Sequence, residues 1–248
     1  MCLIVLAWRP DHAVPLLVAA NRDEFYARPA AALAQWEDEP GIIAGRDLQA
    51  GGTWLGIGPD GRFAALTNIL APERALGSRS RGELPLRFLR GKHSPEQFLH
   101  EVQSEGETYG GFNLLVGDRQ QLWHFNAHSG QAQALPAGIH GVSNADLNSP
   151  WPKLQRAKAA LAQALDSGNE AHLFTLLADN AKPANGQLPD TGVDQEIERL
   201  IASVFIASAD YGTRASTLLF AHADGSRRLI ERSFAAEGVP IGVVRIEV

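Results

Sequence analysis

The sequence predicts an α+β fold in which antiparallel strands form one sheet or two packed sheets, with helices on the outer faces. Two observations carry this prediction. Apolar, β-branched runs occur in pairs around short turns, which is typical of hairpins. Helical patterns occur in blocks between the hairpins rather than after each strand, which argues against a sheet built from βαβ units. With 248 residues, the chain is expected to form a single domain over 1–248.

The two N-terminal strands are expected over 2–8 and 14–20, on either side of a short polar turn. The second strand leads directly into Arg22 and Asp23. In an antiparallel pair, the end of the second strand lies beside the start of the first. Arg22 and Asp23 are therefore expected next to Cys2.

The remaining elements follow from the same patterns. An irregular segment is expected between Arg28-Pro29 and Pro40-Gly41. Further strands are expected over 51–58 (with a loose start), 62–68, 111–117, 121–126, 138–144, 215–221 and 227–235. Helices are expected over 82–90, over 95–104, from 148–152 to 167–168, over 169–179 and over 194–200.

Composition limits the classes of function. The net charge of −6 argues against a protein that follows the phosphate backbone of nucleic acids. The apolar run at the N-terminus is too short to span a bilayer, and it lacks the basic region and cleavage site of a signal peptide. A single cysteine forms no internal disulfide, which fits a reducing compartment. We expect a cytoplasmic protein without a membrane span, whose oligomeric state the sequence leaves open.

No motif predicts a resident cofactor or a metal site. The residues 56–61 fit the spacing of a dinucleotide-binding glycine loop, but that loop must open a helix and the residues after it read as a strand. We interpret this stretch as a hairpin turn. His124 and His128 are four residues apart, but their context is a strand and a loop rather than a helix, so they do not predict a metal site.

Cys2 is the only cysteine, and removal of Met1 would make it the N-terminal residue. An α-amino group beside a thiol is a compact base–nucleophile pair, because the amine titrates near neutral pH. The residues alone leave another interpretation open, in which Cys2 is simply buried and Arg22 and Asp23 belong to a solvated charge cluster. By themselves, Asn68, Asn144 and Arg214 are typical of turns or of groups that satisfy the backbone.

A series of motifs over nearly the whole chain changes this balance. They are Met1-Cys2, Asn21-Arg22-Asp23-Glu24, Gly45-Arg46-Asp47, Gly51-Gly52-Thr53-Trp54-Leu55-Gly56, Thr67-Asn68, Ser80-Arg81-Gly82, Gly111-Phe112-Asn113-Leu114-Leu115, Val142-Ser143-Asn144, Pro150-Trp151-Pro152-Lys153 and Tyr211-Gly212-Thr213-Arg214-Ala215-Ser216-Thr217. In this order they resemble the NRDE family, the homologues of transport and Golgi organisation protein two. That family is similar in turn to the N-terminal nucleophile hydrolases. The resemblance implies their four-layer αββα sandwich, with two mainly antiparallel sheets between helices.

The resemblance also implies a set of site residues. The cysteine branch of these hydrolases includes penicillin V acylase and bile salt hydrolase. Its pattern of an N-terminal Cys, an Arg and an Asp at the end of the second strand, two later Asn residues and a late Arg matches Cys2, Arg22, Asp23, Asn68, Asn144 and Arg214.

These residues suggest a mechanism. The thiolate of Cys2 would attack an acyl carbon of a small acyl amide or thioester, and Asp23 would orient the amine and favour its charged state. Arg22 and Arg214 would lower the pKa of the thiol and position the substrate. Asn144, with or without Asn68, would donate to the oxyanion.

A second hypothesis is a binding or trafficking protein on the same fold, without catalysis. The resemblance implies it, since members of the family are associated with haem trafficking and with lipid or acyl-CoA metabolism. Haem would then be a carried ligand rather than a cofactor, and the partner would be a small acyl or other hydrophobic molecule. A pocket for an acyl chain can hold such a ligand without turning it over. A third interpretation, a stable domain with an inert Cys2, leaves the Arg22 and Asp23 pair unexplained.

Overall fold

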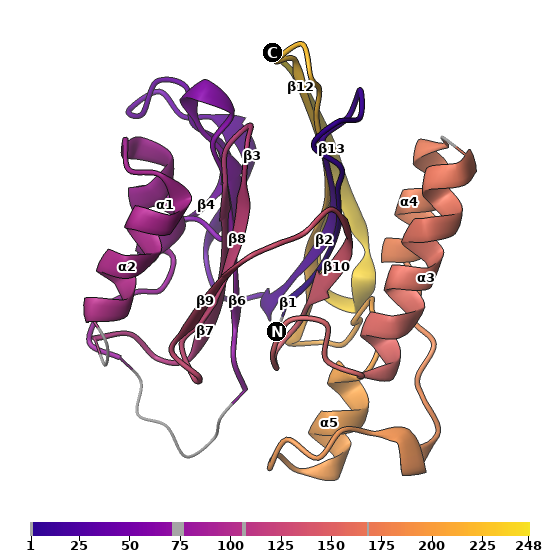
Figure 1. Ribbon diagram of the computed structural model, residues 1–248. Helices are drawn as coiled ribbons and strands as arrows, with labels where there is room; N and C mark the ends of the chain where they lie inside the picture. Colours follow the sequence, from indigo (N-terminus) through magenta and orange to yellow (C-terminus); the bar gives the residue numbers. More distant parts are fainter. Residues whose placement is uncertain (1, 71–76, 106–107, 168) are drawn as a thin grey trace.

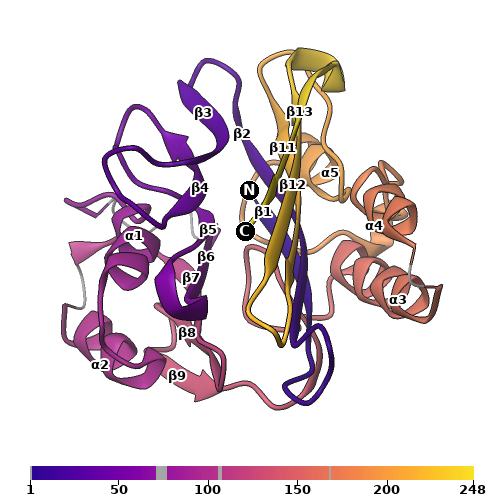
Figure 2. The ribbon, with the colours of Figure 1, turned by 90° about the horizontal axis from the view of Figure 1, so that it is seen from above.

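The computed structural model describes residues 2–70, 77–105, 108–167 and 169–248. These residues form two antiparallel sheets that pack face to face, with helices on the outer face of each sheet (Figure 1). Seen from above, the order of layers is helix, sheet, sheet, helix (Figure 2). The α+β class and the αββα layering predicted from the sequence are therefore confirmed.

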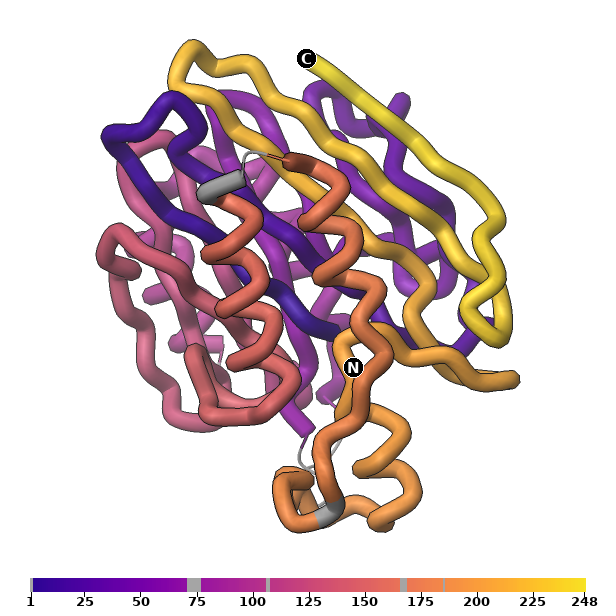
Figure 3. Tube along the Cα trace, turned by 90° about the vertical axis from the view of Figure 1, so that its right-hand side faces the viewer, coloured from indigo at the N-terminus to yellow at the C-terminus, as the bar shows by residue number. Residues whose placement is uncertain are grey.

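The first sheet has six strands in the order β10-β1-β2-β11-β12-β13. Their bounds are β1 Cys2–Trp8, β2 Leu16–Phe25, β10 Gly138–Val142, β11 Tyr211–Ala221, β12 Arg227–Phe234 and β13 Pro240–Glu247. Helices α3 (Pro152–Ser167) and α4 (Glu170–Leu177) cover its outer face over β1 and β2 (Figure 3). The helix α5 (Gln195–Ile201) lies beyond the end of these two.

The second sheet has seven strands in sequence order, from β3 to β9. Their bounds are β3 Ala30–Gln35, β4 Ile43–Asp47, β5 Leu55–Ile57, β6 Phe63–Asn68, β7 Phe112–Gly117, β8 Leu122–Asn126 and β9 Gln131–Ala134. Helices α1 (Glu83–Arg90) and α2 (Pro95–Glu105) cover its outer face. Each strand thus pairs with its neighbours in the sequence, and α1 and α2 lie between β6 and β7 along the chain.

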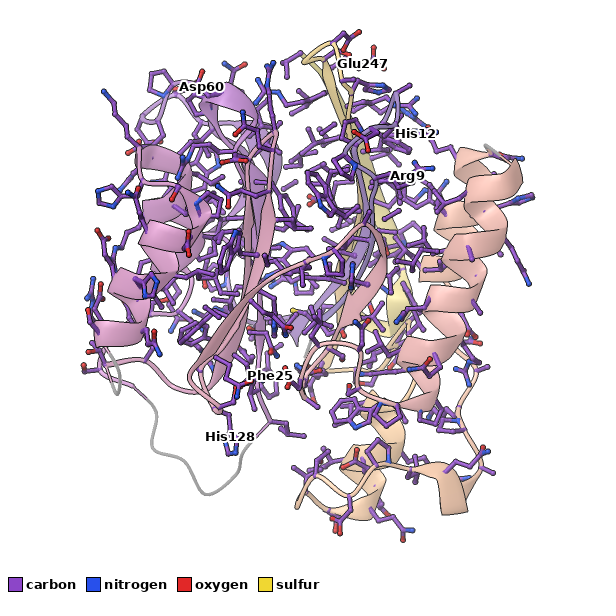
Figure 4. All side chains as sticks on the ribbon, in the orientation of Figure 1. Arg9, His12, Phe25, Asp60, His128 and Glu247 are labelled. Carbon is purple, nitrogen blue, oxygen red and sulfur yellow. The ribbon has the colours of Figure 1, made fainter. Side chains whose placement is uncertain are left out.

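Strand β1 is buried along its whole length because both of its faces are covered. Successive side chains of a strand point to opposite faces. Ile4 and Leu6 accordingly pack against the second sheet, whereas Leu3 and Val5 pack against α3 and α4. Side chains fill the space between the two sheets (Figure 4). This alternation decides which way each residue near the start of β1 faces.

Four strands were not expected from the sequence. They are β3, β4, β9 and β13. The segment between Arg28 and Gly41 is thus not irregular, since it contains β3, whose alanine-rich and mostly exposed sequence carries no strand pattern. Its pairing with β4 and the bond from the Leu33 N–H to the Glu231 carboxylate (2.7 Å) hold it in the sheet. β9 and β13 are exposed edge strands with polar or proline-containing sequences.

Other differences concern boundaries. β2 continues to Phe25, β10 ends at Val142 and β11 begins at Tyr211, because pairing with neighbouring strands decides where each strand ends. The turn at 59–61 joins β5 to β6 as a hairpin, as expected. Gly168, the predicted end of α3, lies outside the described residues. In the part of the chain that the structure describes, no helix has the length and apolar character needed to cross a bilayer.

Candidate active site

Cys2 and Arg22 are direct partners across strands β1 and β2. Residues opposite each other in an antiparallel pair share a face of the sheet, with Cβ atoms about 5 Å apart. Cys2 has the same parity as Ile4, so both side chains face the space between the sheets. The placement predicted for this pair from the two apolar runs is therefore observed.

A cavity of ≈ 260 Å³ opens between the sheets at this end of β1. Its lining comes from both sheets and from the turn that precedes α1. Of the predicted residues, Cys2, Arg22, Asp23, Asn68 and Arg214 line it. The cavity is slightly smaller than the roughly 300–1,000 Å³ of sites for drug-sized ligands, so a small ligand suits it.

Asp23 follows Arg22 along β2 and therefore faces the helical layer instead of the cavity centre. The Thr213 hydroxyl donates to Asp23 Oδ1 at 2.7 Å, and the Tyr211 hydroxyl donates to the Asp23 carbonyl at 3.3 Å. Since Cys2 pairs with Arg22, the next position along β2 lies beside the backbone nitrogen of Cys2. Asp23 is thus placed to meet an amine on that nitrogen.

Burial raises the pKa of Asp23 to about 6, although the nearby charge of Lys153 opposes this shift. Lys153 is itself buried, and its Nζ donates to the carbonyl of Ile201 at 2.8 Å. The carboxylate therefore lies near the start of α3, where Lys153 is hydrogen-bonded to the last residue of α5.

This shift predicts how stability depends on pH. The folded protein binds the Asp23 proton more tightly than the unfolded chain, so this carboxyl stabilises the fold less as the pH rises from its ordinary pKa, 3.8, to about 6. The difference amounts to about 3 kcal/mol. Asp23→Asn keeps an acceptor for Thr213 without the charge. Its free energy of unfolding relative to wild type should therefore rise by up to about 3 kcal/mol between pH 4 and pH 7.

Urea unfolding of both proteins at several pH values measures this difference. Asp11→Asn, at an exposed turn position, is the matched control and should track the wild type throughout. A constant difference between Asp23→Asn and wild type over this range would show that Asp23 ionises normally.

Arg214 reaches the cavity because of a β-bulge. Thr213 pairs with Asp23 and Ala215 pairs with Arg22, so Arg214 is an extra residue between two regular pairs. A bulge of this kind redirects the side chain. Arg214 Nη1 donates to the carbonyl oxygens of Phe25 (3.2 Å) and of Arg28, which hold the guanidinium at the edge of the cavity.

The two predicted asparagines occupy different positions. Asn68, at the end of β6, lines the cavity, and its side-chain amide has no hydrogen-bond partner among the described residues. Asn144 does not line the cavity. Its Nδ2 donates to the carbonyl of Asn68 at 2.7 Å, and its Oδ1 lies 2.9 Å from the Ser143 hydroxyl. That hydroxyl also lies 2.9 Å from the Cys2 carbonyl. Asn144 therefore connects Asn68 with the backbone of Cys2.

Arg81 and Glu231 are among the cavity-lining residues that sequence reasoning missed. Arg81 lines the cavity from the turn before α1, and its Nη1 donates to the Gly111 carbonyl at 3.1 Å. Its signal was the motif Ser80-Arg81-Gly82, to which no role had been assigned. Glu231 lines the cavity from β12 and is 3 % exposed. β12 carries four charged residues, so its sequence does not single out Glu231.

The thiol itself is in an unfavourable state for attack. Burial raises the pKa of Cys2, the Asp23 charge raises it further, and the charge of Arg22 opposes both. The thiol is therefore protonated at neutral pH, so a nucleophilic role requires a base beside it.

Metal ligation has little support among the described residues, where no three His, Cys, Asp or Glu side chains are grouped to hold an ion. None of the described residues that line the cavity is a histidine. His124 is buried at 0 % exposure, burial lowers its pKa to about 4, and its Nε2 lies 3.0 Å from Asn113 Oδ1. Its role is thus in the packing of the second sheet.

Comparison with known proteins gives one family and several relatives. The family model described as "Transport and Golgi organisation 2" matches residues 1–236. A Bos taurus protein named "Transport and Golgi organization protein 2 homolog" is 35% identical over 94% of this chain and 93% of its own length.

Two solved structures are also similar. One is a Caenorhabditis elegans ortholog of N-acylethanolamine-hydrolyzing acid amidase, with a TM-score of 0.46 and 10% identity over 71% of this chain and 86% of its own. The other is a C2A mutant of conjugated bile acid hydrolase from Clostridium perfringens. Its TM-score is 0.47 and its identity is 9%, over 100% of this chain and 92% of its own.

Proposed function

The chain belongs to the Transport and Golgi organisation 2 family, and from that premise we propose that it is an N-terminal-cysteine hydrolase of a small acyl amide or thioester. One observation carries the proposal. The Cys2 thiol faces a cavity beside its strand partner Arg22, while Asp23 lies beside the backbone nitrogen of Cys2. The thiol of Cys2, the guanidinium of Arg22 and the carboxylate of Asp23 thus lie near the nitrogen that becomes an α-amine when Met1 is removed.

The reaction begins with removal of Met1, which leaves an α-amine on Cys2. This amine accepts the thiol proton, and Asp23 stabilises the ammonium that forms. The sulfur then bonds to the acyl carbon and the C–N or C–S bond breaks. The leaving group takes the proton from the ammonium. Water next attacks the Cys2 thioester, with the amine as base, and releases a carboxylic acid and the free thiol.

Asn68 is the side chain best placed to stabilise the oxyanion in this scheme. Its amide lines the cavity and makes no hydrogen bond with the described residues, whereas the amide of Asn144 is engaged by Asn68. An oxyanion donor contributes roughly 3 kcal/mol to the transition state. Asn144 then acts as a positioning residue, which fixes the end of β6 relative to Cys2.

A carrier protein is the second candidate. The raised pKa of the Cys2 thiol favours it, because a protonated thiol suits a binding surface better than a nucleophile. For haem, Cys2 is the only His, Tyr or Cys among the described residues that line the cavity, so it would have to provide the axial ligand. For an acyl or lipid ligand, the sulfur would not be needed, and Cys2→Ser would bind as wild type does.

The test is to trap the acyl-enzyme. Processed protein is mixed with a panel of short acyl amides and thioesters, quenched in acid after milliseconds to seconds, and its intact mass is measured. The proposal expects a mass increase equal to the acyl group, on the N-terminal peptide, together with release of the leaving group. Binding of a panel member without an adduct or any released product would favour the carrier.

A further inference from the structure

Five arginines line the cavity that contains Cys2, which is more positive charge than the proposed chemistry at Cys2 requires. They are Arg22, Arg28, Arg46, Arg81 and Arg214. Guanidinium groups remain charged at any physiological pH, so each needs an anion or exposed solvent nearby. The local partners of each arginine therefore indicate where charge is left without a counterion.

Two of the five are neutralised by carboxylates of the chain. Arg28 donates to Asp47 Oδ2 from Nε (2.9 Å) and from Nη2 (2.7 Å). Arg46 forms a two-point pair with Asp38, with both distances 2.8 Å. Paired arginines of this kind fix the loop and strand ends around the cavity and leave no net charge.

The other three have no carboxylate partner among the described residues. The guanidinium of Arg22 makes no hydrogen bond or ion pair with the described residues, and Arg22 is the strand partner of Cys2. Arg81 donates to the carbonyl of Gly111, and Arg214 to the carbonyls of Phe25 and Arg28. A carbonyl oxygen orients a guanidinium without cancelling its charge. Burial lowers the pKa of Arg214, and the nearby charge of Arg22 lowers it further.

The acidic residues of the lining do not balance this charge. Glu231 accepts from the Leu33 N–H and from the Thr217 hydroxyl at 3.2 Å, and burial raises its pKa. Glu24 is 3.9 Å from Arg28 and accepts from the Phe25 N–H. Burial lowers the pKa of Arg81 and of Arg214 and the charge of Glu24 opposes this shift, but Glu24 forms no ion pair with either of them among the described residues. Since Asp23 faces the helical layer, the five arginines meet four carboxylates around the cavity, those of Glu24, Asp38, Asp47 and Glu231, so the inner surface around Cys2 carries a small excess of positive charge.

We propose that Arg22, Arg81 and Arg214 form an anion-binding subsite beside Cys2, and that the substrate carries a carboxylate or a phosphate close to the bond that Cys2 attacks. This inference rests on the hydrolase function proposed above and names its substrate class. Planar guanidinium groups match the oxygen pairs of both anions. The cavity volume of ≈ 260 Å³ suits a small acyl group together with its anionic group.

The lone cysteine allows a test that needs no turnover. The rate of Cys2 alkylation is measured with iodoacetate, an anion, and with iodoacetamide, its neutral analogue, in the native protein and in the chain unfolded in urea. The subsite should raise the iodoacetate-to-iodoacetamide ratio about tenfold above that of the unfolded chain. Arg81→Gln should abolish most of this preference for iodoacetate, whereas Arg81→Lys, which keeps the charge, should retain it. Arg199→Gln, an exposed position on α5, removes the same charge elsewhere and should change nothing.

Protection experiments then distinguish the two anions. Succinate and inorganic phosphate are titrated against alkylation by iodoacetamide, and the anion that matches the substrate should protect at the lower concentration. Equal ratios in native and unfolded protein, an unchanged ratio in Arg81→Gln, or a Cys2 that reacts with neither reagent would overturn the subsite. Because alkylation does not need catalysis, a positive ratio in a protein without hydrolase activity would refute the hydrolase alone.

Discussion

Replacement of Cys2 by alanine should reduce hydrolysis of the best acyl substrate by about 10⁴-fold or more, since the variant has no atom that can form the acyl-enzyme. Binding of that substrate should change much less, because Arg22, Arg81 and Asn68 remain in the cavity lining. Steady-state hydrolysis and equilibrium binding of one substrate, measured on the same preparation, test both parts.

Structural damage is a poor explanation for such a loss. Cys2 is buried at 9 % exposure, and the substitution removes one sulfur atom at the start of β1. Urea unfolding should therefore differ by about 1 kcal/mol or less from wild type. Cys2→Ser is the matched variant, which keeps the shape but is a weaker nucleophile at its ordinary pKa. Hydrolysis by Cys2→Ala within tenfold of wild type would eliminate Cys2 as nucleophile.

Substitution of Asn21 by alanine should lower the free energy of unfolding by about 3–5 kcal/mol. Its Nδ2 donates to the carbonyls of Leu177 and Val204, both at 2.9 Å, and its Oδ1 accepts from the Ser216 hydroxyl at 2.7 Å. The side chain is 0 % exposed. Its removal leaves three buried polar groups without their partner, and each costs roughly 1–3 kcal/mol.

The bonds of Asn21 tie the end of α4 and the segment before β11 to β2, so the loss should extend to the site. Urea unfolding of Asn21→Ala measures it. Ser216→Ala removes one of the three bonds and should cost about 1–2 kcal/mol. A loss below about 1.5 kcal/mol for Asn21→Ala would mean that water or a local shift satisfies the freed carbonyls.

The placement of Cys2 opposite Arg22 was predictable because it depends only on neighbouring segments of the sequence. Two apolar runs and a short turn place Cys2 opposite Arg22, since antiparallel register follows from hairpin geometry. Strand alternation alone then separates Asp23 from Arg22. The family resemblance added the late residues, and the structure brings Asn68 and Arg214 to the same cavity as Cys2.

The rest depends on contacts between distant segments. Arg81 comes from the turn before α1. Glu231 comes from β12, which lies two strands away from β2 in the first sheet. No spacing rule in the sequence connects either residue with Cys2. The face of Arg214 depends on a bulge whose register is visible only in the pairing with β2. β3 could not be recognised from its own residues, because β4 and Glu231 supply most of the bonds that hold it in place.

The relative roles of the two asparagines illustrate the same limit. Order along the chain suggested Asn144 as the principal oxyanion donor. Its amide instead bonds to the Asn68 carbonyl, and Asn68 is the one that lines the cavity. Substitution of each by alanine, with kcat and KM measured separately, tests this assignment: Asn68→Ala should lower kcat by about 10²–10³-fold.

The most direct test of the account is activity before and after exposure of the Cys2 amine in one protein. A fusion is prepared in which a removable N-terminal partner replaces Met1 and ends directly before Cys2, so that proteolysis leaves Cys2 first in the chain. We predict that the uncleaved fusion does not hydrolyse acyl amides or thioesters, and that cleavage produces both hydrolysis and a trapped acyl adduct on Cys2. Equal activity before and after cleavage, or a correctly cleaved and folded protein that acylates with no member of the panel, would contradict the proposed hydrolase.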